Sequence, residues 1–356
     1  MGRLMNKLYT AVMFLAVSSI AVAGGNSSHS AHSGMKAGSG VHFFGQLYVG
    51  FDKRSTGSGN SVDSIRDDGG KSRLGLKFKE NLGSMSLVGH AEWKFDIADG
   101  NSTSDSSSSC NDAADCRTFD LHIGNLGFMT PLGYIGIGSF ESPYKTMGMY
   151  DSNMDTALAL NAHGGTSGGN FGIAGTWDSS IMYQGAMGPI EVGYIRGMSS
   201  ETAAATAPNV KKSDYALGVT VKHLMPGLEL GIARSHDKSG DSNRGISNDK
   251  VFASYKIMPN LGAFYTEEEI EIAGGGTAAG DVTTVGLHYN MGNNMIQFVH
   301  VQGNMDAATT DYDVVGLSNE MTLSKSSSLT IGVTRKGTEG TDNAKSTFAL
   351  GLLHKF

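Results

Sequence analysis

Residues 71 to 97 read KSRLGLKFKENLGSMSLVGHAEWKFDI, and apolar side chains alternate with polar or small ones in both halves of this stretch. In the first half Leu74, Leu76 and Phe78 fall on one face, opposite the basic residues Arg73, Lys77 and Lys79. In the second half Leu87, Ala91 and Trp93 oppose His90, Glu92 and Lys94. A period of two indicates a strand whose two faces meet different surroundings. The stretch therefore predicts two antiparallel strands joined by the turn Asn81-Leu82-Gly83.

The same alternation continues from residue 41 to the end of the chain, so we expect an all-β protein. Its 356 residues include 50 Gly and only 6 Pro. Length alone would suggest two soluble domains, but the pattern contains no convincing amphipathic helix. The formal net charge is −7. Scattered Lys and Arg in an acidic chain argue against a nucleic-acid partner.

The lengths of the connections decide between a soluble sandwich and a membrane barrel. Seven short turns are expected, at residues 81–83, 129–133, 187–189, 225–227, 258–262, 291–294 and 325–327. Eight longer polar connections are expected, at residues 53–70, 98–116, 141–176, 199–212, 238–248, 273–280, 304–310 and 337–345. Short and long connections alternate, which is typical of a transmembrane barrel with short periplasmic turns and long extracellular loops. The pattern therefore predicts a 16-stranded antiparallel transmembrane β-barrel.

The N-terminus has the pattern of a secretory signal peptide. Arg3 and Lys7 precede the apolar stretch 8–20, and Ala21-Val22-Ala23 is a cleavage site of the A-x-A type. We expect cleavage after residue 23, a flexible Ser/Gly/His linker over 24–40 and the barrel over 41–356. Loss of Arg3 and Lys7 lowers the formal charge from −7 to −9. No later apolar run is long enough for a membrane helix.

The only two cysteines, Cys110 and Cys116, lie in one Ser/Asp-rich connection. Exported proteins meet an oxidising environment, so a small loop disulfide is expected. Two thiols alone would be an unusual metal site. We expect no metal and no cofactor.

Four segments resemble a known family. They are SRLGLK (72–77) followed by ENLG (80–83), LGYIGIG (132–138), DSSIMY (178–183) and the ending GLLHKF (351–356). Together they are similar to the trimeric Gram-negative general porins, especially those common in β-proteobacteria. One departure is Ser139, which stands where the family pattern has Arg.

The resemblance implies a homotrimer in the bacterial outer membrane, in which the third long loop, here 141–176, folds inward into each channel. It also implies that the terminal Phe356 is read by the barrel-assembly machinery. The acidic run Glu267, Glu268, Glu269 and Glu271 suggests either bound divalent cations that bridge lipopolysaccharide or an ordinary solvated surface. Outer-membrane lipid and lipopolysaccharide are therefore the expected surroundings.

An inward loop would narrow the pore and set its size and charge preference. The candidate loop residues are Glu141, Lys145, Asp151 and Asp155. On the family pattern, the candidate wall residues are Arg73, Lys77, Lys79 and Lys94. Acidic residues on the loop and basic residues on the wall would produce an electric field across the passage. The wall is mixed in charge, because Glu92 also faces inward. With a charge of −9 we expect weak selectivity, slightly in favour of cations.

The expected function is passive diffusion of small hydrophilic solutes and ions through a water-filled channel. Two alternatives stay open: a substrate-specific outer-membrane channel and a non-conducting surface barrel that acts as an adhesin. A barrel hydrolase would need a nucleophile and a base held together at one rim, and no pattern places such partners. We therefore do not expect an enzyme.

Overall fold

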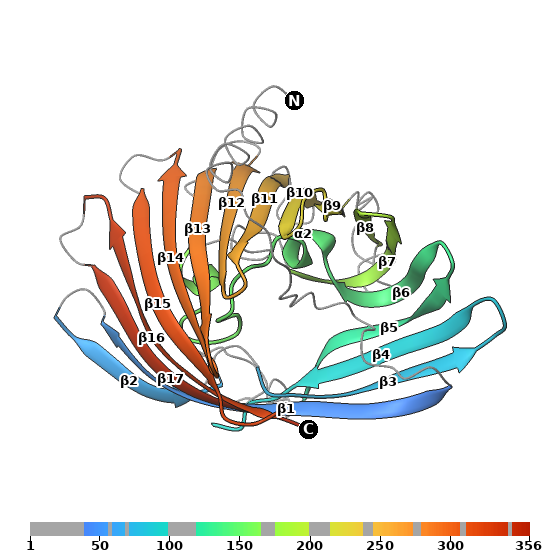
Figure 1. Cartoon of the computed structure of the whole chain (residues 1–356), viewed down its shortest axis with the longest axis horizontal. Helices are drawn as coiled ribbons and strands as arrows, with labels where there is room; N and C mark the ends of the chain where they lie inside the picture. Colours follow the sequence, from blue (N-terminus) through green and yellow to red (C-terminus); the bar gives the residue numbers. More distant parts are fainter. Residues whose placement is uncertain are drawn as a thin grey trace, which may run out of the picture.

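The computed structural model describes residues 39–55, 59–67, 71–98, 119–164, 175–198, 214–237, 245–272, 279–306, 311–340 and 344–356. The expected signal peptide, almost all of the expected linker and both cysteines lie outside these ranges. The described chain is a single antiparallel sheet that curls into a barrel (Figure 1). Among the described residues no helix is long and apolar enough to cross a membrane.

The sheet contains seventeen strands that pair mostly in chain order. They are β1 (Gly40–Ser55), β2 (Ser61–Arg66), β3 (Arg73–Asn81), β4 (Ser86–Lys94), β5 (Asp120–Thr130), β6 (Gly133–Glu141), β7 (Thr176–Met187), β8 (Ile190–Gly197), β9 (Tyr215–Lys222), β10 (Leu228–Asp237), β11 (Ile246–Met258), β12 (Leu261–Ile272), β13 (Gly280–Met291), β14 (Asn294–Met305), β15 (Tyr312–Thr322), β16 (Ser327–Thr338) and β17 (Lys345–Lys355). All seven expected short turns join consecutive strands at the predicted places.

Strands β2 and β3 share one position in the barrel, which therefore has sixteen positions. The N-terminal part of β1, Gly40 to Gln46, pairs with β3, and its C-terminal part, Gly50 to Ser55, pairs with β2. Between these ladders the Ser72 hydroxyl accepts a hydrogen bond from the Tyr48 amide at 2.9 Å. The longer polar connection expected over 53–70 thus contains a strand, Ser61–Arg66. This six-residue strand is too short to show a clear alternation in the sequence.

The barrel closes where β1 pairs with β17, from Gln46 opposite Lys355 to Arg54 opposite Thr347. Closure pairs the first strand with the last, so neither is left as an open edge of the sheet along this seam. The chain end takes part, because the Phe356 amide donates to the Gly45 carbonyl at 3.0 Å and the Gly45 amide donates back at 3.1 Å. The Phe356 ring covers Gly45, where an added Cβ would lie 2.3 Å from the ring.

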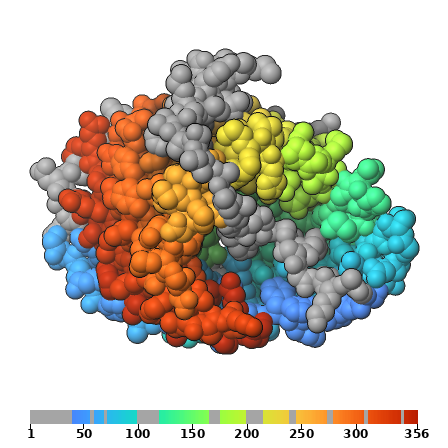
Figure 2. All heavy atoms as spheres, viewed as in Figure 1, coloured from blue at the N-terminus to red at the C-terminus, as the bar shows by residue number. Residues whose placement is uncertain are grey.

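The two faces of the wall follow the alternation seen in the sequence. On β1 the apolar residues Val41 and Phe43 are exposed on the outside, whereas Tyr48 and Asp52 are buried inside. Exposed Leu, Ile, Val and Phe side chains recur on the outer face of other strands, as expected for contact with lipid. In Figure 2 the side chains of the later strands, coloured orange to red, form a continuous wall.

Two short helices, α2 (Pro143–Thr146) and α3 (Leu160–His163), lie in the connection between β6 and β7. Helix α2 begins because the Ser142 side chain accepts a hydrogen bond from the Lys145 amide, with Pro143 at the first helical position. Helix α3 ends at Gly164, whose φ of 93° suits a glycine. In Figure 1 this segment lies within the ring of strands.

Candidate functional site

The described part of the β6–β7 connection, residues 142–164, is docked against inward-facing side chains of the barrel. We call it the lumen segment. Its first anchor is Tyr144, which is fully buried and donates a 2.5 Å hydrogen bond to Glu268 of β12. Lys250 of β11 donates to the Tyr144 carbonyl, and its ammonium lies 4.6 Å from the centre of the Tyr144 ring. Lys250 and Glu268 are directly opposite each other in the sheet, so one charged pair holds the start of the segment.

A second set of contacts fixes the middle of the lumen segment to strands β10, β14 and β15. The Tyr150 hydroxyl donates to Glu229 at 2.9 Å. The Asn153 amide group donates to Gln297 at 3.1 Å and to Ser318 at 3.0 Å. These partners are spread over three strands, so the segment is held along its length and not only at its ends.

The end of the segment is anchored around helix α3. Leu160 is buried among Phe264, Val299 and other apolar side chains of strands β12 to β15. The Tyr312 hydroxyl donates to the Gly164 carbonyl at 2.6 Å. Because apolar packing and hydrogen bonds act together here, this end of the segment has a defined position against the wall.

Asp151 organises the segment internally. One carboxylate oxygen accepts from the Asn153 amide at 2.9 Å, and the other accepts from the Leu160 amide at 2.7 Å. Burial raises the pKa of Asp151 to about 6, although these two backbone donors favour the charged form. The structure thus places Asp151 inside the fold of the segment, where it links residues that are nine positions apart.

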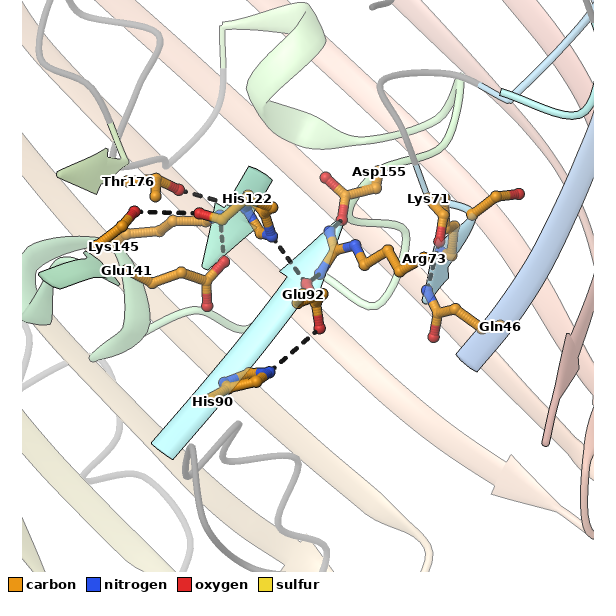
Figure 3. A network of polar contacts seen from close by, with 12 residues as sticks. Gln46, Lys71, Arg73, His90, Glu92, His122, Glu141, Lys145, Asp155 and Thr176 are labelled. Carbon is orange, nitrogen blue, oxygen red and sulfur yellow. Dashed lines mark hydrogen bonds and ion pairs between the residues drawn. The ribbon is translucent and has the colours of Figure 1, made fainter. Parts of the chain in front are cut away.

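Asp155 reaches the opposite wall. The Arg73 guanidinium donates to Asp155 at 2.5 Å and lies 3.3 Å from Glu92 (Figure 3). His122 extends this network, because its ring nitrogen Nδ1 lies 2.8 Å from the Glu92 carboxylate. Burial alone would raise the pKa of Asp155, but the positive charges of Arg73, Lys94, Lys145 and Lys71 together outweigh that effect and lower it. Loop and wall are therefore joined by a chain of charges that alternate in sign.

Glu141 and Lys145 pair with each other and not across the lumen. Their atoms lie 2.6 Å apart, at the i and i+4 positions where β6 leads into α2 (Figure 3). Each charge is largely neutralised by the other. Two of the four candidate loop residues thus form a local ion pair.

The remaining wall candidates have a different environment. Lys94 is opposite Arg73 in the β3–β4 ladder, and Lys77 is opposite His90. The Lys77 ammonium lies 5.1 Å from the centre of the Phe44 ring. Lys79 is on the same face of β3, nearer the short-turn end. Within the described chain, none of these three lysines forms an ion pair with a carboxylate.

The structure thus brings Arg73, Asp155, Glu141 and Lys145 to one region, with Lys94 on the adjoining strand. The sequence-based selection missed the anchors, namely Tyr144, Tyr150, Glu229, Lys250, Glu268 and Gln297. A weak signal existed, since Lys250 and Glu268 are charged residues at inward positions of neighbouring strands. The described residues contain no group of three or more His, Cys, Asp or Glu side chains that could hold a metal ion.

Comparisons with known proteins agree with this architecture. The family model described as Gram-negative porin matches residues 10–341. Among solved structures, the anion-selective porin from Comamonas acidovorans is 18% identical, with a TM-score of 0.68 over 89% of this chain and 100% of that one. OmpT of Vibrio cholerae in its trimer form is 16% identical, with a TM-score of 0.63 over 90% and 100%.

A third similar structure is the outer membrane channel DcaP of Acinetobacter baumannii. It is 13% identical, with a TM-score of 0.62 over 90% of this chain and 99% of that one. At these identities the likeness shows a shared fold. A search of curated proteins finds no match.

Proposed function

We propose, given that the chain belongs to the Gram-negative porin family, that the lumen segment sets the width of its channel. The protein is an outer-membrane β-barrel for the passive diffusion of solutes. A barrel of this size leaves an aqueous channel that side chains of the wall alone do not fill. A segment held inside it must therefore limit what passes.

The observation that carries this proposal is the spread of the anchors around the barrel. Hydrogen bonds tie the segment to Glu268, Glu229 and Gln297 on one side and to Arg73 on the other. Hydrogen bonds to charged groups contribute about 1.5–3 kcal/mol each, so several together resist displacement by solvent. The narrowest passage then lies beside the Arg73–Asp155 pair, bordered by Glu92, Lys94, Glu141 and Lys145.

The charge pairing supports a preference for anions at this passage. The loop acids Glu141 and Asp155 are each matched by a cation within 2.6 Å. Lys77, Lys79 and Lys94 have no such partner in the described part of the chain. A solute therefore meets an excess of positive charge. The net charge of the mature chain suggested a slight cation preference instead, but local charges decide selectivity at a constriction. One similar structure is an anion-selective porin.

The assembly that we propose is a homotrimer, as one structurally similar protein occurs in a trimer form. The exposed apolar outer face would then contact neighbouring subunits and outer-membrane lipid. Phe356 would serve as the signal for the barrel-assembly machinery. Its place at the seam, over Gly45 of β1, suits a residue that takes part in closure.

Planar-bilayer recording tests the function and its selectivity separately. The purified protein should give stepwise openings, and a KCl gradient should give a reversal potential of the sign that indicates anion preference. Lys94→Glu should shift that potential towards cation preference, whereas Lys325→Glu, in an exposed short turn, should not. Openings without anion preference would overturn the selectivity proposal alone. A protein that gives no openings would favour the adhesin alternative. Saturable block of the channel current by one solute would favour a substrate-specific channel.

A further inference from the structure

The outer face of the barrel carries a hollow of about 390 Å³ on strands β8 to β11. We call it the outer-face hollow. It is lined chiefly by Tyr194, Arg196, Asp214, Tyr215, Arg234 and His236. Its volume is within the range of small-molecule sites.

The side of the wall on which it lies follows from the inner contacts of the same strands. A Cβ on Gly193 would meet Pro143 at 2.9 Å, and one on Gly218 would meet the Met147 sulfur at 2.4 Å, so both glycines face the lumen segment. Side chains alternate along a strand. Tyr194 and Arg196 on β8 and Tyr215 on β9 therefore point away from the lumen, towards the membrane.

The level of the hollow along the barrel axis is also defined. Strand β8 ends at Gly197 and β9 begins at Tyr215, so the hollow lies where the long connections start. These strands form the yellow to yellow-green part of the barrel in Figure 2. Nearer the short turns the outer face is apolar, with Leu217 and Ile232 each 40% exposed. Aromatic residues between an apolar band and long loops are typical of the membrane interface.

The hollow combines charge with flat aromatic surfaces. Arg234 is 46% exposed and lies 3.3 Å from Asp249. Arg196 is exposed and makes no ion pair with any carboxylate of the described ranges. The Tyr215 and His236 rings lie 5.7 Å apart, and His236 is held by Ser247 at 2.7 Å. Two guanidinium groups beside ordered rings form a preorganised polar surface that faces lipid.

We propose that the outer-face hollow binds the phosphorylated sugar headgroup of an outer-leaflet glycolipid. Guanidinium groups bind phosphate with two parallel hydrogen bonds. Tyrosine rings pack against the apolar face of a sugar. The rings beside the two guanidinium groups favour a phosphosugar over free phosphate. The inference rests on the outer-membrane location of the barrel and names one site for its lipid partner.

The test uses the full mature chain, refolded in detergent without glycolipid and titrated with purified lipopolysaccharide. Binding is measured by native mass spectrometry, with phosphatidylglycerol and inorganic phosphate as competitors. The double variant Arg196→Gln, Arg234→Gln should bind roughly 10- to 100-fold more weakly, because two charge-assisted contacts are lost. Tyr215→Leu, which keeps an apolar side chain, should also weaken binding. The matched control is Arg335→Gln, an exposed arginine on the outer face of β16.

Unchanged affinity in the double variant would overturn the proposal, as would an equal loss in the Arg335→Gln control. Displacement of the glycolipid by millimolar inorganic phosphate would show a simple phosphate site and contradict the sugar contacts. Single-channel conductance of each variant is recorded in parallel and should equal that of the wild type. A glycolipid defect with normal conductance therefore separates this proposal from the channel function.

Discussion

Arg73 of strand β3 and Asp155 of the lumen segment form a 2.5 Å ion pair across the inside of the barrel. Their side chains are only 13% and 24% exposed, so water screens the pair weakly. Arg73 also contacts Glu92. One guanidinium therefore both fixes the position of the segment and pairs with two acids beside the passage.

Removing Arg73 should weaken the anion preference of the channel. Arg73→Gln leaves Glu92 and Asp155 without their main cation, so the reversal potential in a KCl gradient should shift towards cations. Asp155→Asn should shift it towards anions, because an acid is lost while Arg73 stays. The control is Asp313→Asn on the outer face, where the carboxylate pairs with His300. Shifts of the same sign in both lumen variants would contradict the assignment.

The anchor at the start of the segment predicts that a single hydroxyl affects channel noise. Tyr144→Phe removes the hydrogen bond to Glu268 from a buried site, at a cost of about 1.5–3 kcal/mol. The segment should move more, so single-channel currents should fluctuate more. Tyr183→Phe removes a comparable hydroxyl from an exposed position, where it donates to the Leu132 carbonyl. Equal noise in wild type and Tyr144→Phe would show that this anchor does not hold the segment.

Asp151 predicts a pH dependence of stability. Its pKa is raised from 3.8 to about 6 by burial, so the folded state binds more protons than the unfolded state between these values. This contribution to stability is complete below pH 4 and is lost as the pH rises through 6, by at most about 3 kcal/mol. The melting temperature of the folded barrel should therefore fall more between pH 4.5 and 7 in the wild type than in Asp151→Asn. Identical pH profiles of the melting temperature in the wild type and in Asp151→Asn would contradict this role of Asp151.

The seam contact predicts an assembly defect. Phe356→Ala should lower the amount of heat-modifiable folded protein in the outer membrane, because the ring that covers Gly45 is lost. Gly45→Leu should have a similar effect, since its side chain would occupy the place of the ring. Phe348→Ala removes an exposed aromatic residue from β17, the strand that Phe356 directly follows, and serves as the control. Normal folded levels without Phe356 would exclude the proposed signal.

The sequence was sufficient for features that depend on local periodicity. The alternation of β3 and β4 placed Arg73, Lys77 and Glu92 on the inner face, and turn residues such as Met187-Gly188-Pro189 marked the strand ends. These features follow from the pleat and from backbone preferences, which act over a few residues.

Contacts between distant segments could not be read in the same way. Asp151 looked like a pore-lining acid, yet it binds two backbone amides, and that role depends on how residues 151–160 fold back. Similarly, Tyr144 meets Glu268 across 124 positions of sequence. The alternation of polar and apolar residues predicts which face of the sheet a strand residue occupies. It does not predict which residue of an irregular segment that side chain contacts.

The central claim is that the lumen segment sets the passage size, and deletion of residues 151–169 tests it most directly. This removes Asp155, Asn153 and helix α3, and with them the contacts to Arg73, Gln297 and Tyr312. Single-channel conductance is recorded together with the size limit for uncharged sugars in liposome swelling. Both should rise in the deletion variant, provided that its heat-modifiable folded form is intact. A folded variant with unchanged conductance and the same sugar limit would show that the constriction lies elsewhere.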